Sequence, residues 1–184
     1  MAWRSHGTTN ATLIANLTAN SLVKSPLVSQ AMLAVDRAHF VPDASAAYRD
    51  SPQSIGHSAT ISAPHMHAAA AEALLGYLRP GARVLDVGSG SGYLSCVLAG
   101  LVAPSGGDGG NGGVVVGVEH IEALREMGER NTAKSELGRE WLRSGAVRFV
   151  KGDGRRGWRG EGFEGGWDAI VSFSSFSSIA CYCS

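Results

Sequence analysis

"VLDVGSGSGYL", from Val84 to Leu94, is a buried-type apolar run that ends in an acid and leads into three alternating glycines. The run predicts a strand, and the apolar residues after Gly92 predict a helix. Glycines at the mouth of a helix let the backbone turn tightly and approach a bound nucleotide, while the first helical turn offers free N–H groups. Because strand, glycines and helix occur together, a ligand site is favoured over a glycine turn that binds nothing.

The same alternation of strands and helices continues along the chain. Apolar runs at 113–119, 146–153 and 167–173 predict three further strands. Helices are expected at 93–102 and 121–138, between successive strands. This rhythm is typical of βαβ units, in which a parallel sheet carries helices on its faces. The sequence therefore predicts an α/β fold.

Helical segments also precede the glycine stretch. Asn10 is expected to cap a first helix, and Ser25-Pro26 to open a second. A third is expected from about Pro64 to Leu78, after an irregular stretch at 43–63. We therefore expect one domain over 1–170, made of a helical flank (1–50) and a βαβ core (80–170).

Two segments depart from this rhythm. Residues 103–113 are rich in glycine and predict a flexible insertion between the first βα unit and the second strand. Residues 171–184 combine Ser, Phe and Cys without a useful period, and we expect this atypical tail to be disordered. The fourth strand would then remain an open edge, and the sheet would be incomplete at the C-terminus.

Composition excludes several classes of protein. Lys plus Arg equals Asp plus Glu at 16 each, so the chain lacks the basic field of a nonspecific nucleic-acid binder. It has no apolar signal core or membrane-length run, which favours a cytoplasmic protein without a membrane partner. Three cysteines give no disulfide framework. His65 and His67, two apart on one helix, point in different directions, so no metal site is expected.

Acidic residues end the first three predicted strands. Asp86 stands two residues before the first glycine, where an acid suits a positively charged amino or sulfonium group better than a pyrophosphate. Glu119 can accept two hydrogen bonds from a ribose, or it is a solvated strand-end acid. Asp153 can face an adenine amino group, or it forms an ordinary Asp-Gly turn. The G-x-G-x-G spacing differs from the dinucleotide pattern.

These features together resemble the S-adenosylmethionine-dependent methyltransferases of the Rossmann-like class. "MLAVDRAHFVP" (32–42), "DSPQSIG" (50–56), "ATISAPHMHA" (59–68) and "LDVGSGSGYL" (85–94) look like the signature stretches of the protein-L-isoaspartate O-methyltransferases, and "MAW" at the start resembles eukaryotic members. The resemblance runs from Met1 to about Ile170.

The resemblance implies transfer of a methyl group from S-adenosyl-L-methionine to the free α-carboxylate of L-isoaspartyl and D-aspartyl residues. Damaged peptides and proteins are then the substrates of a monomeric repair enzyme. That carboxylate is itself the nucleophile, so the enzyme aligns atoms and excludes water rather than supplying a strong base. Ser62 matches the family's active-site serine. The residues that match cofactor-binding positions are Ala59, Thr60, Ile61, Ser62, His67, Asp86, Gly88, Ser89, Gly90, Glu119, Asp153 and Gly154.

Alternatives remain for Ser62 and for the whole chain. Ser-Ala-Pro-His is also an ordinary helix cap with Pro in the first turn. After about Ile170 the chain departs from the family pattern and resembles a truncated or misjoined member, which implies a weak or inactive cofactor-binding module. A methyltransferase for another substrate is the third alternative. The adenine amino-group methylases fit poorly, because "DAIVSFSSFS" lacks their acid or Asn followed by Pro-Pro and an aromatic residue.

Overall fold

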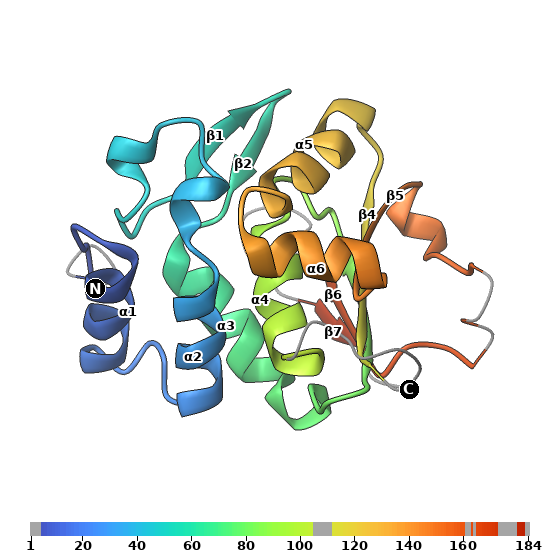
Figure 1. Cartoon of the computed structure of the whole chain (residues 1–184), viewed down its shortest axis with the longest axis horizontal. Coiled ribbons are helices and arrows are strands. Elements are labelled where there is room, and N and C mark those ends of the chain that lie inside the picture. Colours follow the sequence, from blue (N-terminus) through green and yellow to red (C-terminus); the bar gives the residue numbers. More distant parts are fainter. Residues whose placement is uncertain (1–4, 105–111, 161–162, 164, 173–179, 183–184) are drawn as a thin grey trace.

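A five-stranded sheet forms the right-hand part of the protein in Figure 1. The computed structural model describes residues 5–104, 112–160, 163, 165–172 and 180–182. The strand order is β5-β4-β3-β6-β7, and all neighbours are parallel except β6 and β7. The strands are β3 (Arg83–Val87), β4 (Val114–Glu119), β5 (Val147–Lys151), β6 (Ala169–Ser172) and β7 (Ala180–Tyr182). The predicted α/β class with a parallel sheet is confirmed.

The register of the three leading strands brings their carboxyl ends together. Asp86 of β3 lies opposite Gly117 of β4, and Glu119 of β4 lies opposite Lys151 of β5. Loops that leave these ends therefore start side by side, at the edge where open α/β sheets bind ligands.

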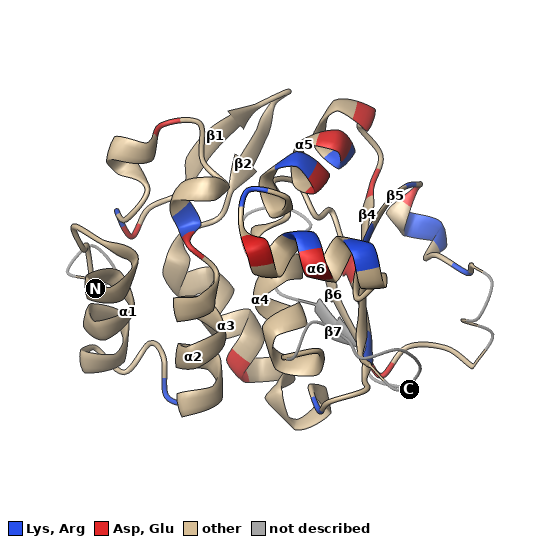
Figure 2. Ribbon diagram, in the orientation of Figure 1, with Lys and Arg blue, Asp and Glu red and all other residues tan. Residues whose placement is uncertain are grey.

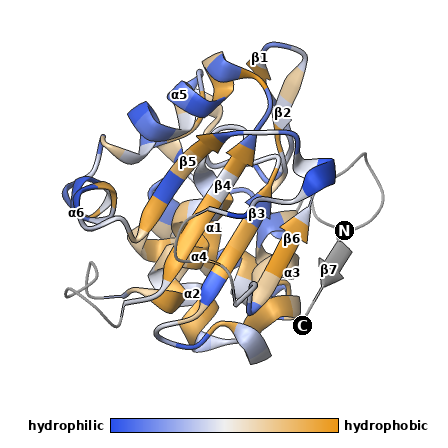
Figure 3. Cartoon of the chain, turned by 90° about the vertical axis from the view of Figure 1, so that its right-hand side faces the viewer, coloured by the Kyte–Doolittle hydropathy of each residue, from blue (hydrophilic) through white to orange (hydrophobic). Residues whose placement is uncertain are grey.

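The helices of the described residues all cover one face of this sheet (Figures 1 and 3). Directly on the strands lie α4 (Tyr93–Val102), α5 (Glu122–Thr132) and α6 (Glu136–Ser144). Every residue of α4 except Gly100 is buried, so this helix is the centre of the core. Every second side chain of a strand faces the helices, and Val84 of β3 and Val115 of β4 lie in the same core.

The opposite face has no helix among the described residues, which corrects the expectation of helices on both faces. Trp158, Phe163 and Trp167 cover it instead, packed on Leu85 and Val116. The rings of Phe163 and Trp167 stack with centroids 4.7 Å apart. The segment between β5 and β6 is too rich in glycine to favour a helix, so large aromatic side chains supply the apolar cover.

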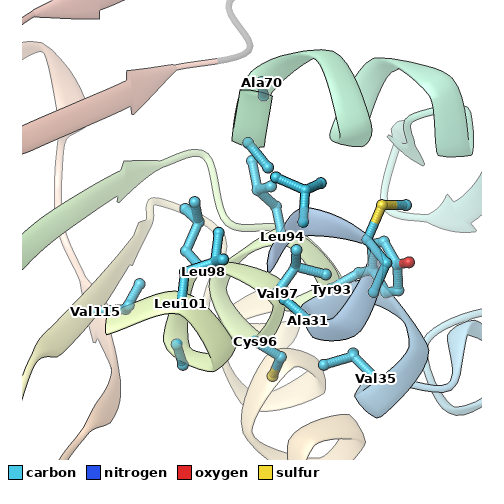
Figure 4. Close-up of a cluster of buried hydrophobic side chains, with 14 of the residues drawn as sticks. Ala31, Val35, Ala70, Tyr93, Leu94, Cys96, Val97, Leu98, Leu101 and Val115 are labelled. Atoms are coloured by element: carbon cyan, nitrogen blue, oxygen red, sulfur yellow. The ribbon is translucent and has the colours of Figure 1, made fainter. Parts of the chain in front are cut away.

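Three N-terminal helices form an outer layer beyond α4: α1 (Asn10–Ala19), α2 (Pro26–Ala34) and α3 (Pro64–Leu74). The short turns of 3-10 helix are η2 (Arg37–His39), η3 (Ala44–Ala46), η4 (Leu75–Tyr77) and η5 (Gly154–Arg156). A Cβ at Gly100 of α4 would lie 3.2 Å from the Cβ of Ala31, so α2 and α4 approach closely. Figure 4 shows the apolar side chains between them, with Tyr93 at the start of α4.

Helix caps agree only partly with the sequence analysis. Ser25 caps α2 as expected, and Pro26 is its first residue. Thr9, however, caps α1, and the prediction for Asn10 is wrong. The Asn10 side chain donates to the carbonyl oxygens of Met32 and Leu33 instead, which ties α1 to the end of α2.

The charged segment 121–138 forms two helices rather than the single one expected. α5 ends at Thr132, and Ser135 caps α6 by accepting a hydrogen bond from the N–H of Gly138 at 2.9 Å. A Cβ at position 138 would collide with the Thr132 carbonyl, so the glycine permits the sharp turn between the helices. Charged residues concentrate on α5 and α6, whereas α1 and α2 carry none (Figure 2).

A hairpin that the sequence analysis missed lies within 43–63. β1 (Gln53–Gly56) pairs antiparallel with β2 (Ala59–Ile61). His57 and Ser58 turn between them with φ angles of 52° and 56°. These left-handed angles usually carry glycine or asparagine, so the turn had no sequence signal.

The far edge of the sheet also differs from expectation. β7 pairs with β6 through Ile170↔Tyr182 and Ser172↔Ala180, so the backbone of β6 has a partner on both sides and is not an open edge. Residues 173–179 and 183–184 of the predicted disordered tail lie outside the described residues. Within the described ranges, no helix has the length and apolar character that crossing a membrane requires.

Candidate functional site

The glycine loop between β3 and α4 is anchored on β4. Gly88 donates to the Val118 carbonyl at 2.8 Å, with a φ of 83° that favours glycine. Gly92 caps α4 with a φ of 85°. A Cβ there would lie 2.9 Å from Phe149 and 3.0 Å from the Cα of Gly128. The last glycine is thus required both by its backbone angle and by the close approach of α5 and β5.

Side chains around the loop hold its shape and leave one polar atom unused. The Asn131 side chain of α5 donates to the Ser91 carbonyl at 3.1 Å. Ser89 is 8% exposed, and its hydroxyl has no hydrogen-bond partner among the described residues. A buried hydroxyl without a partner costs free energy. This hydroxyl packs against β4, because its oxygen lies 3.0 Å from the position of a Cβ on Gly117.

Asp86 lies beneath the loop at the end of β3. It is 1% exposed, and it accepts a hydrogen bond from the Ser95 hydroxyl at 2.6 Å. Burial raises the pKa of Asp86 to about 6, and the nearby Glu119 adds to that increase. A cationic group near this carboxyl would favour its ionised form.

Glu119, the last residue of β4, is held by the backbone. One carboxylate oxygen accepts from the N–H groups of His120 and Ile121, at 2.8 and 3.1 Å. The other accepts from the N–H of Gly90 at 3.2 Å. The carboxylate is 4% exposed and fixed in orientation, beside the glycine loop as predicted.

Asp153 follows β5 and is engaged differently. Its carboxylate oxygens accept from the Arg155 guanidinium at 2.9 and 2.8 Å. This hydrogen bonding lowers the pKa of Asp153 to about 2. A Cβ at Gly154 would collide with Val87, so η5 lies directly against the end of β3.

The β1–β2 hairpin carries the upstream candidates over the loop. The Ile55 side chain reaches to 3.6 Å from the position of a Cβ on Gly90. In β2, Thr60 is exposed and Ala59 half-buried, whereas the Ile61 side chain lies in the core. Any contact of Ile61 with a ligand would therefore use its backbone.

Ser62 joins β2 to α3, and its alternative role as a helix cap is wrong. The residue at the cap position is Ala63, whose side chain forms no capping hydrogen bond. The N–H of His65 donates to the buried carboxylate of Asp50 at 3.0 Å, so a residue from outside the helix satisfies this donor. Ser62 is half-buried, and its carbonyl accepts from Arg37 at 2.8 Å.

His67 is buried inside the first turns of α3. Its ring lies 4.9 Å from the Tyr93 ring, which follows Gly92, and its Nδ1 lies 3.4 Å from Arg37. Burial holds the pKa of His67 well below its usual value, and the charge of Arg37 lowers it further. The imidazole is thus neutral near pH 7.

Most sequence-predicted site residues come together at this edge, and four supporting residues were missed: Arg37, Asp50, Ser95 and Asn131. Their partners are distant in sequence, except for Ser95, so no local spacing could identify them. No group of three or more His, Cys, Asp or Glu side chains within the described residues could hold a metal ion.

Comparison with known proteins gives concordant matches. The model of the family Protein-L-isoaspartate(D-aspartate) O-methyltransferase (PCMT) matches residues 8–175. Protein-L-isoaspartate O-methyltransferase of Caenorhabditis elegans is 48% identical over 157 residues, which cover 85% of this chain and 65% of that protein. Protein-L-isoaspartate O-methyltransferase 1 of Arabidopsis thaliana is 46% identical over 149 residues, covering 81% of this chain and 61% of that protein.

A solved structure is similar as well. It is a Plasmodium falciparum protein assigned as a protein-L-isoaspartate O-methyltransferase, crystallised with S-adenosyl-L-homocysteine, and it has a TM-score of 0.79 at 29% identity. The match covers 95% of this chain and 77% of that one. By contrast, the match spans less than two thirds of the length of each of the two curated relatives described above. With a family model that matches nearly its whole length, this chain belongs to the protein-L-isoaspartate (D-aspartate) O-methyltransferase family.

Proposed function

We propose that this chain transfers a methyl group from S-adenosyl-L-methionine to the free α-carboxylate of L-isoaspartyl and D-aspartyl residues in damaged proteins. The observation that carries the proposal is the glycine loop flanked by two buried acids, with the Ser89 hydroxyl unpartnered among the described residues. The S-adenosyl-L-homocysteine bound to the similar Plasmodium protein supports the choice of cofactor.

The residues at the strand ends divide the binding task. The fixed carboxylate of Glu119 is suited to accept hydrogen bonds from ribose hydroxyls. The carboxylate of Asp86, buried beneath the loop, would favour a cationic amino or sulfonium group nearby. Backbone groups of Gly88, Ser89 and Gly90 would line the cofactor, which supplies a methyl group that its sulfonium already activates.

The other predicted site residues would contact the two ends of the bound cofactor and the substrate. Asp153 and Gly154, after β5, are assigned to the adenine, as the Asp153 carboxylate can accept from an amino group. On the other side, Ala59, Thr60, Ile61, Ser62 and His67 approach from the hairpin and α3. The Ser62 hydroxyl would hold one oxygen of the substrate carboxylate, which is ionised at neutral pH and needs no base.

The same proposal extends to the wider context of the protein. We assign a helical flank (1–50) and a cofactor-binding core (80–170) to the methyltransferase domain, and extend the domain beyond 170 to the paired strands β6 and β7. Its partners would be isoaspartyl peptides and proteins rather than nucleic acids or membranes, and the chain would act as a cytoplasmic monomer.

Replacement of Ser62 tests the catalytic assignment. Ser62→Ala should lower methyl transfer to an isoaspartyl peptide by about 10-fold or more, since a hydrogen bond to a charged group contributes ~1.5–3 kcal/mol. Cofactor affinity and melting temperature should stay close to those of the unmodified chain, because Ser62 does not cap α3.

Ser54→Ala is the matched control, since Ser54 is an exposed serine on β1 of the same hairpin. It should leave turnover unchanged. Equal turnover in Ser62→Ala and the unmodified chain would contradict the role of Ser62. Cofactor binding without transfer to any isoaspartyl peptide would instead indicate a binding module.

A further inference from the structure

Arg37 is a buried cation that the cofactor and substrate assignments do not use. It lies in η2, after α2, and is 0% exposed. Burial lowers the pKa of its guanidinium to about 10, so it remains charged near neutral pH. A buried charge is costly unless hydrogen bonds compensate it, so the partners of Arg37 reveal what it does.

Those partners belong to the two segments that meet at the site. One terminal nitrogen of Arg37 donates to the Ser62 carbonyl at 2.8 Å, and the other lies 3.4 Å from Nδ1 of His67. The guanidinium carbon lies 5.3 Å from the centre of the Tyr93 ring, in cation–π geometry. Arg37 therefore contacts both the joint before α3 and the first residue of α4.

The contact with His67 also defines the state of that ring. Arginine has donors and no acceptor, so Nδ1 of His67 is the acceptor in this contact. The proton of the neutral imidazole then resides on Nε2. The tautomer of His67 is thus an observable that depends on the Arg37 side chain.

The joint at Ser62 needs such a support. Between the end of β2 at Ile61 and the start of α3 at Pro64, Ala63 forms no side-chain cap. Asp50 holds the N–H of His65, one residue beyond Pro64, and Arg37 holds the carbonyl of Ser62. These two buried charged residues together fix the turn from both sides.

We propose that Arg37 is a positioning residue, which holds Ser62 and His67 in register with the first turn of α4 and so with the glycine loop. The inference rests on the proposed function, since it makes the placement of Ser62 matter for methyl transfer. It adds a residue that touches neither cofactor nor substrate.

The test compares Arg37→Met, Arg37→Lys and Val28→Ala in the full chain. Arg37→Met removes the charge and the hydrogen-bond donors at similar volume. Arg37→Lys keeps the charge but lacks the planar guanidinium, which can donate in two directions at once. Val28 is a buried residue of α2, so its truncation is a control for a loss of stability alone. Melting, affinity for S-adenosyl-L-homocysteine, kcat and KM for an isoaspartyl peptide, and the His67 tautomer by NMR are measured for each.

Arg37→Met is expected to lower kcat per folded molecule about tenfold or more, as befits loss of a charged hydrogen bond. Arg37→Lys should recover part of the lost kcat. It should also remain folded if Arg37→Met proves unable to fold. In Arg37→Met the NMR resonances of the His67 ring should shift, because Nδ1 loses the Arg37 donor. Val28→Ala should lower the melting temperature with kcat and tautomer unchanged.

Other outcomes would overturn the inference. If Arg37→Lys and Val28→Ala both lose stability but keep kcat per folded molecule, Arg37 is merely structural. Resonances of the His67 ring that do not move in Arg37→Met, which has no donor, would contradict the contact itself. If the unmodified chain binds S-adenosyl-L-homocysteine but methylates no isoaspartyl peptide, the proposed function fails, and the tautomer and cofactor affinity alone decide the role of Arg37.

Discussion

The ends of β3 and β4 differ sharply from the end of β5, although all three carry an acid at the same edge of the sheet. Asp86 and Glu119 are 1% and 4% exposed. The Ser95 hydroxyl donates to Asp86, whereas backbone N–H groups donate to Glu119 and the exposed His120 ring lies 3.0 Å from it. The Asp153 side chain is 36% exposed, and its partner, Arg155, is 90% exposed.

This difference separates two carboxylates of fixed orientation from one that can reorient. A carboxylate held by buried backbone groups keeps its orientation before any ligand arrives, so binding has less to order. An exposed ion pair is screened by water and contributes little. We therefore expect changes at β3 and β4 to have large effects and changes at β5 to have small ones.

The largest expected effect is on stability, at Asp86. Its pKa rises from 3.8 to about 6 in the folded protein, so its contribution to stability is fully present below about pH 4 and is lost as pH rises through 6. This increase in pKa corresponds to a free energy of ~3 kcal/mol. The free energy of unfolding of Asp86→Asn, relative to the unmodified chain, should therefore rise by about that amount between pH 4 and pH 7.

Urea unfolding at several pH values measures this difference. His67, whose pKa is depressed, acts in the opposite sense, since its contribution is present above about pH 6.5 and is lost as pH falls. Both proteins contain His67, so its effect cancels in the comparison. A difference that does not change with pH would show that Asp86 has an ordinary pKa.

The next effect is on cofactor binding, at Glu119. Glu119→Ala should weaken the binding of S-adenosyl-L-homocysteine by ~1–3 kcal/mol, because ribose hydroxyls lose a buried acceptor. Glu119→Gln keeps the shape and one acceptor oxygen, so it should weaken binding less. Titration calorimetry gives both values, and unchanged affinity in Glu119→Ala would remove the ribose assignment.

The contrast between strand ends also explains which features the sequence could predict. The glycine stretch predicted β3, the loop and α4, because a buried run and glycines with positive φ are local signals. The prediction that Glu119 ends a strand is confirmed, because the apolar run before it is also a local signal. Glu119 also accepts from the N–H of Gly90, which is distant in sequence, whereas Asp153 pairs with the nearby Arg155; no sequence pattern distinguishes these two geometries.

Features without a local signal in the sequence were not predicted. The turn at His57 and Ser58 has left-handed backbone without glycine, so the β1–β2 hairpin was not foreseen. Aromatic side chains replace a helix on the second face of the sheet, because tertiary packing decides that cover. The type of Asn10 favours a cap, but its amide instead donates to the end of α2, a contact that is 22 residues away in sequence.

The smallest effect is expected at the end of β5. Arg155→Met would free the Asp153 carboxylate from its exposed partner, so cofactor affinity should rise, by less than about fivefold, since exposed pairs contribute ~0–1 kcal/mol. Calorimetry at low and at high salt should show this gain shrinking as salt increases. Weaker binding in Arg155→Met would instead assign a direct ligand contact to the arginine.

Methyl transfer to two peptides of identical sequence, one with an isoaspartyl and one with an aspartyl residue, tests the central claim most directly. The purified 184-residue chain is incubated with methyl-labelled S-adenosyl-L-methionine and each peptide, beside the Caenorhabditis elegans relative as a positive control. The account predicts a labelled methyl ester on the isoaspartyl peptide alone. Label on neither peptide, or on both equally, while the relative methylates only the isoaspartyl one, would contradict it.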